Sequence, residues 1–188
     1  MGFTSILNEH QHCVAGLSEL AEAIEAVGML LAQTLRSGGK ILICGNGGSA
    51  ADAQHFAAEL IGRFELERAA WPAIALTTDT SILSAIGNDY GFADVFSRQV
   101  QGLAQKGDAL IGISTSGHSE NIARAVELAA SRGLATVGLL GRDGGPLASR
   151  VDHALVVAHN RTARIQEAHI LILHYWAMFI EDQLTRSI

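Results

Sequence analysis

The stretch from residue 41 to residue 60, ILICGNGGSAADAQHFAAEL, is the part of the chain that most restricts its fold. It begins with an apolar run typical of a buried strand, passes through a glycine-rich turn and continues as a helix. The same helix carries His55 and Glu59, which lie four residues apart and therefore share one face. The stretch predicts an anion-binding corner joined to a metal-ligand or acid–base pair.

Short apolar runs alternate with helical patterns along the rest of the chain. We expect parallel strands at residues 41–44, 73–77, 109–113, 136–140 and 154–157. We expect helices between them at about residues 49–62, 81–86, 93–105 and 119–131. This alternation predicts an α/β fold with a doubly wound open sheet and right-handed crossovers. No linker or repeat divides the 188 residues, so we expect one domain.

Two longer helical patterns flank this core. The first runs from about residue 6 to residue 36 and ends at the Ser-Gly-Gly of residues 37–39. The second, at residues 165–184, is apolar on more than one face. A helix that is apolar nearly all round is normally buried. In a chain of this size we expect it to pack against another subunit, and we infer a homo-oligomer.

Charge and composition exclude several classes of protein. The net charge of −6 argues against a nucleic-acid-binding role. No apolar run approaches the roughly 20 residues of a membrane span, so we expect no membrane association. No secretory signal is recognisable, and Cys13 and Cys44 are too few for a disulfide framework. We therefore expect a cytoplasmic protein.

The turn at residues 45–50 fits G-x-G-x-x-A, a pattern of dinucleotide-binding sites. The acidic residue expected about 20 positions later is poorly matched, because Glu65 and Glu67 precede the second strand. Ser49 with Asp52 fits a helix N-cap pattern. A purely structural turn is one interpretation. The interpretation we favour is a turn whose backbone N–H groups face a polar ligand at a helix N-terminus.

A second corner of the same kind follows the third expected strand, in the sequence ISTSGHSEN of residues 113–121. Ser114, Thr115, Ser116 and Ser119 place hydroxyl groups at the start of a helix, although serine-rich turns often serve only as caps. In a 2-1-3-4-5 sheet, the first and third strands are neighbours at the switch point where ligands bind. Two such corners predict a phosphate monoester site. No Gly-Lys-Ser/Thr occurs, which argues against a nucleotide triphosphatase.

The second long helix carries Gln166, His169 and His174 in an otherwise apolar stretch. Gln166 and His174 are eight residues apart and so share a side of the helix. Together with His55 and Glu59 they are suited to a zinc site, although glutamine is an unusual ligand. The alternative is that these are satisfied polar residues in a packed interface. Spacing alone leaves both interpretations open.

Taken together, these motifs closely resemble those of the bacterial sedoheptulose-7-phosphate isomerases (phosphoheptose isomerases) of the sugar isomerase (SIS) domain superfamily. The resemblance runs nearly end to end. Its carriers are CGNGGSAADAQHFAAEL (44–60), LTTDTSILSAIGNDYGF (76–92), ISTSGHSEN (113–121), GRDGG (141–145) and TARIQEAHILILH (162–174).

The resemblance implies a flavodoxin-like sheet of five parallel strands in a single SIS domain, residues 1–188. An oligomerisation helix would cover about residues 2–36. The family assembles as a homotetramer with active sites at subunit interfaces, in agreement with the oligomer inferred from the end helices. Some members carry an acidic residue just before R-I-Q, where this chain has Ala163. A sugar contact from that position is absent here or comes from Asn160 or Arg161.

The implied reaction converts D-sedoheptulose 7-phosphate to D-glycero-D-manno-heptose 7-phosphate through a cis-enediol, in the biosynthesis of ADP- or GDP-heptose. By resemblance, Glu59 is the base and His174 the acid. One Zn²⁺ per subunit would be bound by His55, Glu59, Gln166 and His174. The implied substrate-binding residues are Asn46, Gly47, Gly48, Ser49, Glu59, Arg63, Asn88, Asp89, Ser114, Thr115, Ser116, Ser119 and Gln166.

Two other functions use similar sequences. The DnaA initiator-associating proteins share the tetrameric fold and bind a protein partner in replication initiation. That group lacks acid–base residues at the positions of Glu59 and His174, which favours the enzyme here. A sugar-phosphate-sensing regulator is disfavoured because no helix-turn-helix or basic extension accompanies the domain.

Overall fold

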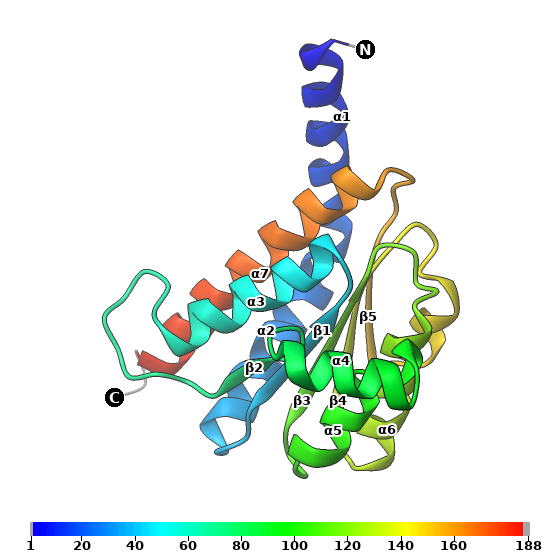
Figure 1. Cartoon of the computed structure of the whole chain (residues 1–188). Coiled ribbons are helices and arrows are strands. Elements are labelled where there is room, and N and C mark those ends of the chain that lie inside the picture. The colour runs from blue at the N-terminus through cyan, green and yellow to red at the C-terminus, as the bar shows by residue number, and fades with distance from the viewer. Residues whose placement is uncertain (1, 186–188) are drawn as a thin grey trace.

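A five-stranded parallel sheet forms the centre of the molecule (Figure 1), in a computed structural model that describes residues 2–185. Its strands are β1 (Ile41–Gly45), β2 (Ala73–Ala75), β3 (Ala109–Ser114), β4 (Ala135–Gly141) and β5 (His153–Val157). They are arranged in the order β2-β1-β3-β4-β5. Both the strand positions and the order agree with the prediction. The predicted domain also includes residue 1 and residues 186–188, which lie outside the described range.

Helices cover both faces of this sheet. The α-helices are α1 (Phe3–Ala15), α2 (Ala21–Arg36), α3 (Gly48–Ile61), α4 (Thr80–Asp89), α5 (Ser97–Leu103), α6 (Glu120–Ser131) and α7 (Thr162–Thr185). Three 3₁₀ segments are η1 (Gly16–Leu20), η2 (Phe92–Asp94) and η3 (Gly145–Ser149). Among these residues, no helix is long and apolar enough to cross a membrane.

Alternation along β1 shows how the two layers of core arise. Ile41 and Ile43 are fully buried on one face, in the cluster that includes residues of α2, α3 and α7. Leu42 and Cys44 are fully buried on the other face, in the cluster with residues of α5 and α6. A parallel strand covered on both sides needs apolar residues at every position, which is the pattern the sequence has.

The N-terminal segment differs from its predicted form. A single helix was expected from about residue 6 to residue 36, but α1 and α2 are separated by the 3₁₀ turn η1. The Ser18 hydroxyl donates a hydrogen bond to the carbonyl of Ala15, 2.9 Å away, and such local bonds compete with the α-helical ladder. The apolar stripe of the sequence continues through residues 16–20, so the pattern does not indicate the break. Helix α1 projects beyond the body of the molecule (Figure 1).

The helix expected at residues 93–105 is also broken, into η2 and the shorter α5. The preceding helix α4 is longer than expected at both ends, and Asp79 caps its start. The Asp79 carboxylate accepts a hydrogen bond from the N–H of Ile82 at 2.9 Å. These differences affect the side of the sheet away from α3 and α7.

Helix α7 is buried on one face within the single chain. Ile165, Leu173 and Trp176 have no exposed surface, and the Trp176 indole N–H donates to the carbonyl of Ile24 in α2 at 2.8 Å. We expected this helix to be buried against another subunit. For this face that expectation is wrong, because residues of the same chain cover it. A second face stays open, since Leu171 is 45% exposed and Met178 44%.

Candidate active site

The first corner, between β1 and α3, begins with a backbone conformation that requires glycine. Gly47 has φ +56° and precedes the first residue of α3. The N–H of Ser49 donates to the carbonyl of Asn46 at 3.0 Å. The predicted N-cap at Ser49 is therefore wrong: Gly47 occupies that position, and Ser49 is 3% exposed inside the first turn. The helix begins at Gly48 because the chain turns at Gly47, whose φ is positive.

The second corner, between β3 and α6, is held by its own hydroxyl groups. The Oγ atoms of Ser114 and Ser119 are 2.9 Å apart, and the N–H of Gly117 donates to Ser114 Oγ at 3.1 Å. Gly117 has φ +68°, and a Cβ atom there would lie 1.9 Å from the carbonyl oxygen of Gly144. The loop therefore has a fixed shape, with its serines and the start of α6 facing the first corner.

A pair of asparagine side chains joins the two corners. Asn46 donates to Asn121 Oδ1 at 3.0 Å, and Asn121 donates back to Asn46 Oδ1 at 2.9 Å. Asn121 is 4% exposed and also accepts from the N–H of Ile122. Asn121 was not among the predicted site residues. Its place in the ISTSGHSEN segment was a signal, but its partner Asn46 lies 75 residues away in the chain.

A cavity of about 270 Å³ lies between the corners. Its lining includes most of the predicted phosphate-binding residues. They are Asn46, Gly47, Gly48, Ser49, Ile113, Ser114, Thr115, Ser116, Ser119, Thr162 and Gln166. Thr162, at the start of α7, was not predicted. Among residues 2–185, no charged side chain lines this cavity, so hydroxyl groups, amides and the N-termini of α3 and α6 set its polarity.

Gln166 brings α7 to the edge of the cavity. Its amide packs directly on Gly48, because a Cβ atom added to Gly48 would lie 2.3 Å from Gln166 Nε2. The absence of a side chain at Gly48 is what lets the two helices approach here. Gln166 and His174 both face α3, as the sequence predicted.

The predicted acid–base residues lie together along the same pair of helices, which run side by side in Figure 1. His55 Nε2 is 2.8 Å from His174 Nε2 and 3.2 Å from Glu59 Oε1. The His55 side chain is 43% exposed and that of Glu59 21%. The ring of Phe64 packs against His174, with the ring centroids 5.7 Å apart. This arrangement leaves the three polar side chains open to a ligand on one side.

These three residues fit a divalent metal ion. One potential ligand atom from each of His55, Glu59 and His174 lies within 4.8 Å of the others. Ligands that share a tetrahedral zinc ion lie on the order of 3 Å apart, and the separations of His55 from His174 and from Glu59, 2.8 Å and 3.2 Å, are close to that value. Two imidazoles and a carboxylate are also the donor set zinc accepts. The donor chemistry therefore agrees with the predicted metal site.

His169 takes no part in this group. It is fully buried, and its Nε2 hydrogen-bonds to the carbonyl of Leu140 at the end of β4, 3.0 Å away. Burial lowers its pKa to about 4, although the hydrogen bond to Leu140 acts in the opposite direction. His169 is therefore neutral and fixes α7 against the sheet.

Four predicted substrate contacts lie outside the cavity, and one of them, Glu59, belongs to the acid–base group described above. Asn88 and Asp89 end helix α4 on the surface and hydrogen-bond to each other at 2.8 Å. Arg63 is exposed after the end of α3, with Nε 3.7 Å from Glu67 Oε2. Their role stays a prediction.

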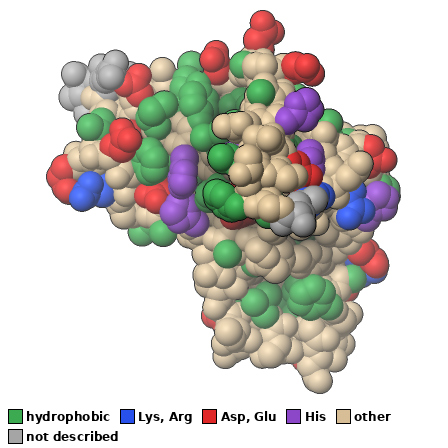
Figure 2. Space-filling model, turned by 90° about the horizontal axis from the view of Figure 1, so that it is seen from above, with side chains coloured by type: hydrophobic (Ala, Val, Ile, Leu, Met, Phe, Trp, Pro, Cys, Tyr) green, Lys and Arg blue, Asp and Glu red, His purple; other side chains and the backbone are tan. Residues whose placement is uncertain are grey.

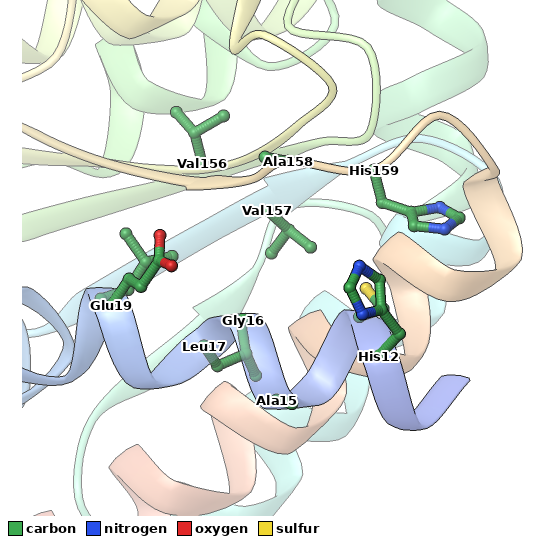
Figure 3. Close-up of a pocket in the computed structure, with 11 residues that line it drawn as sticks. His12, Ala15, Gly16, Leu17, Glu19, Val156, Val157, Ala158 and His159 are labelled. Atoms are coloured by element: carbon green, nitrogen blue, oxygen red, sulfur yellow. The ribbon is translucent and has the colours of Figure 1, made fainter. Parts of the chain in front are cut away.

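A larger hollow of about 400 Å³ lies elsewhere, between the α1–η1 segment and residues 156–159. Figure 3 shows His12 and His159 at one end of it and Glu19 toward the other. The view from above (Figure 2) shows histidine side chains next to hydrophobic ones on the surface. The hollow contains none of the predicted site residues, and its walls combine apolar side chains with the polar side chains of His12, Glu19 and His159.

The fold and the cavity define a SIS domain. The sequence profile of that family, described as "SIS domain", matches residues 7–141. Among solved structures, the phosphoheptose isomerase of Neisseria gonorrhoeae has a TM-score of 0.90 and 48% sequence identity. That similarity covers 95% of this chain and 96% of the other.

The chain belongs to the phosphoheptose isomerases. The phosphoheptose isomerase of Nitratiruptor sp. is 56% identical over 177 residues, which is 94% of this chain and 95% of the relative. That of Geobacter sulfurreducens is 58% identical over 166 residues, covering 88% of each. The chain is therefore an isomerase, and these relatives do not support the initiator-associating alternative.

Proposed function

We propose that this isomerase interconverts D-sedoheptulose 7-phosphate and D-glycero-D-manno-heptose 7-phosphate, using Glu59 and His174 for proton transfer. The observation that carries the proposal is the grouping of His55, Glu59 and His174 along the same helix pair as a hydroxyl-lined cavity. The names of the relatives support the substrate class. The product is a precursor of ADP- or GDP-heptose. A cytoplasmic location stays a prediction.

The cavity is suited to the phosphate group. Ser114, Thr115, Ser116 and Ser119 offer hydroxyl donors, and the first turns of α3 and α6 offer backbone N–H groups. Helix N-termini attract anions because their unpaired N–H groups carry partial positive charge. Phosphate bound there leaves the sugar chain to extend along α3 and α7 toward Glu59 and His174.

The acid–base residues then act at the other end of the sugar. Interconverting a 2-ketose and an aldose moves one proton between two carbons and one between two oxygens. Glu59 takes the carbon-bound proton, and a proton from the same carboxyl group, after exchange with solvent, goes to the neighbouring carbon, while His174 donates a proton to the carbonyl oxygen and recovers one from the adjacent hydroxyl. Both protons balance, and the intermediate is an enediol.

We further propose that His55, Glu59, Gln166 and His174 hold one zinc ion per subunit. The spacing of the three ligand atoms supports this, and Gln166 lies on the same side of α7 as His174. Zinc would supply a positive charge that polarises the substrate carbonyl. Glu59 would shift between ligand and base during the reaction.

A homotetramer with active sites at subunit interfaces completes the proposal. The open face of α7, with Leu171 and Met178, supports it, as does the apolar hollow lined by Leu17, Ala21, Ile24 and Tyr175 beside Leu171. Exposed apolar surface of this kind marks association sites. In such an assembly the exposed Arg63, Asn88 and Asp89 would reach substrate at an interface, and the projecting N-terminal segment, about residues 2–36, would contribute to packing.

The test is an NMR assay of sedoheptulose 7-phosphate with and without a chelator, for the wild type and Glu59→Gln. We expect conversion by the wild type, loss of most activity with chelator, and recovery on adding zinc. Glu59→Gln should stay folded and lose activity by about 10²–10⁴-fold, the usual contribution of a general base. An active Glu59→Gln variant would remove Glu59 from the mechanism.

A further inference from the structure

Helix α3 ends at Ile61, and a guanidinium group from the following loop caps that end. Arg68 Nη2 donates to the carbonyl of Glu59 at 2.7 Å, and Nη1 donates to the carbonyl of Leu60 at 2.9 Å. The last carbonyl groups of a helix lack partners within it, and a cation there also complements the helix dipole. The Arg68 side chain is only 4% exposed, so this cap is built into the interior.

A buried carboxylate from α7 holds the same arginine. Glu181 is 2% exposed, and its Oε1 lies 3.0 Å from Arg68 Nε. Glu181 also accepts hydrogen bonds from three successive backbone N–H groups, those of Phe64, Glu65 and Leu66, at 2.9–3.0 Å. The ring of Trp71 covers the guanidinium, 3.7 Å from the ring centroid. Both carboxylate oxygens of Glu181 and most N–H groups of the Arg68 guanidinium therefore have hydrogen-bond partners.

This network contacts both proposed proton-transfer residues. Arg68 binds the backbone of Glu59 directly. The N–H of Phe64 binds Glu181, and the ring of Phe64 packs against His174. His174 and Glu181 are seven residues apart on α7, two turns of the same face.

We propose that Arg68 and Glu181 form a brace that sets the position of Glu59 relative to His174, and that they are positioning residues for the isomerisation. The brace holds the last turn of α3 to α7 and keeps the Phe64 ring on His174. Neither residue stands in a motif that predicts a role for it. This proposal rests on the proposed proton-transfer function of Glu59 and His174.

A second buried ion pair provides a matched control. Lys40 Nζ lies 2.6 Å from Asp108 Oδ2, and Asp108 is 3% exposed. Asp108 also accepts backbone N–H groups, those of Lys40 and Gln105. This pair lies at the amino ends of β1 and β3, the opposite edge of the sheet from the site. Asp108→Asn therefore removes a comparable buried carboxylate without touching α3 or α7.

The experiment compares Glu181→Gln with Asp108→Asn. We measure kcat and KM per folded protein, and the imidazole ¹H–¹⁵N NMR signals of His174 in the metal-free protein. We expect Glu181→Gln to lower kcat at least tenfold with KM within twofold, and to shift the His174 signals. Asp108→Asn should lose stability but keep kcat, KM and those signals.

A Glu181→Gln variant that is destabilised like Asp108→Asn, yet keeps kcat and the His174 signals, overturns the brace. If Glu181→Gln does not fold, Arg68→Lys decides by the same criteria, because it retains the charge and loses only the fork of donors. The two proposals fail separately. An active Glu59→Gln rejects the proton-transfer assignment, whereas an inactive Glu59→Gln beside an unimpaired Glu181→Gln rejects the brace alone.

Discussion

His55 differs from its two neighbours in the role its position supports. It lies between Glu59 and His174, within 3.2 Å of one and 2.8 Å of the other. Both of its contacts are to atoms that would share a metal ion. The proposal therefore treats His55 as a ligand that orients the site, and treats Glu59 and His174 as ligands that also exchange protons with the substrate.

This difference predicts separable effects of substitution. His55→Ala should weaken zinc binding, so activity falls by about 10-fold or more at low zinc and recovers in part as zinc is added. Glu59→Gln should not recover at any zinc concentration, because the base itself is missing. The measurement is the isomerisation rate as a function of free zinc. Equal zinc dependence in the two variants would contradict the division of roles.

His169 predicts a pH dependence of stability. Burial lowers its pKa to about 4 in the folded chain, whereas an exposed histidine titrates near 6.5. Between those values the unfolded chain binds the extra proton, so the free energy of unfolding falls as pH drops from about 6.5 to about 4. The full shift corresponds to about 3 kcal/mol.

Denaturant unfolding at several pH values, for the wild type and His169→Gln, measures this contribution. The amide of Gln can still donate to the carbonyl of Leu140, so the variant should fold and lose part of the pH slope. The two proteins must be compared because Asp52 has the opposite effect on the free energy of unfolding as the pH falls. Burial raises the pKa of Asp52 to about 6, with His55 opposing the shift. Parallel curves for both proteins would exclude His169 as the source.

The two strand-to-helix corners depend on each other through Asn46 and Asn121. Asn121→Asp preserves the shape and the bond to the N–H of Ile122, but the carboxylate cannot donate to Asn46 and brings a negative charge beside the phosphate cavity. We expect KM to rise about tenfold or more, the scale of leaving a buried polar group unpaired. The exposed Asn8→Asp on α1 makes the same change of charge as a control. An unchanged KM in Asn121→Asp would show that the corners bind substrate independently.

An element could be predicted when the residues that determine it lie close together in the chain. The two corners were predictable because a buried strand, a glycine-rich turn and a helix start lie within one short segment, as at residues 41–60. The break at η1 was not, since its apolar positions continue the helical stripe. The N-cap at Ser49 was wrong because the positive φ of Gly47 decides where α3 begins.

The candidate site shows the same limit. His55 and Glu59 are recognisable from their spacing, and Gln166 and His174 from being polar in an apolar helix. Asn121, Thr162, Arg68 and Glu181 matter only through contacts between segments far apart in the chain, such as Arg68 and Glu181, separated by 113 residues. Spacing within one element carries no information about such partners.

Seen as a whole, the chain leaves one face of α7 open at Leu171 and Met178, and α1, which an ion pair between His10 and Glu167 joins to α7, projects from the body of the molecule (Figure 1). If a second copy covers that face, Leu171→Glu should break the assembly, because burying a charge without a partner is costly. Light scattering should then show a smaller species with reduced activity. Leu103→Glu, an exposed leucine on α5, should leave the mass unchanged. A Leu171→Glu protein of wild-type mass would place the interface elsewhere.

The central claim is that Glu59 transfers a carbon-bound proton of the sugar phosphate. It is tested most directly by running the reaction in D₂O and following deuterium at carbons 1 and 2 by NMR. We expect the wild type to incorporate deuterium while it interconverts the two sugars, and folded Glu59→Gln to do neither. Glu59→Gln that converts and labels the substrate at the wild-type rate would contradict it.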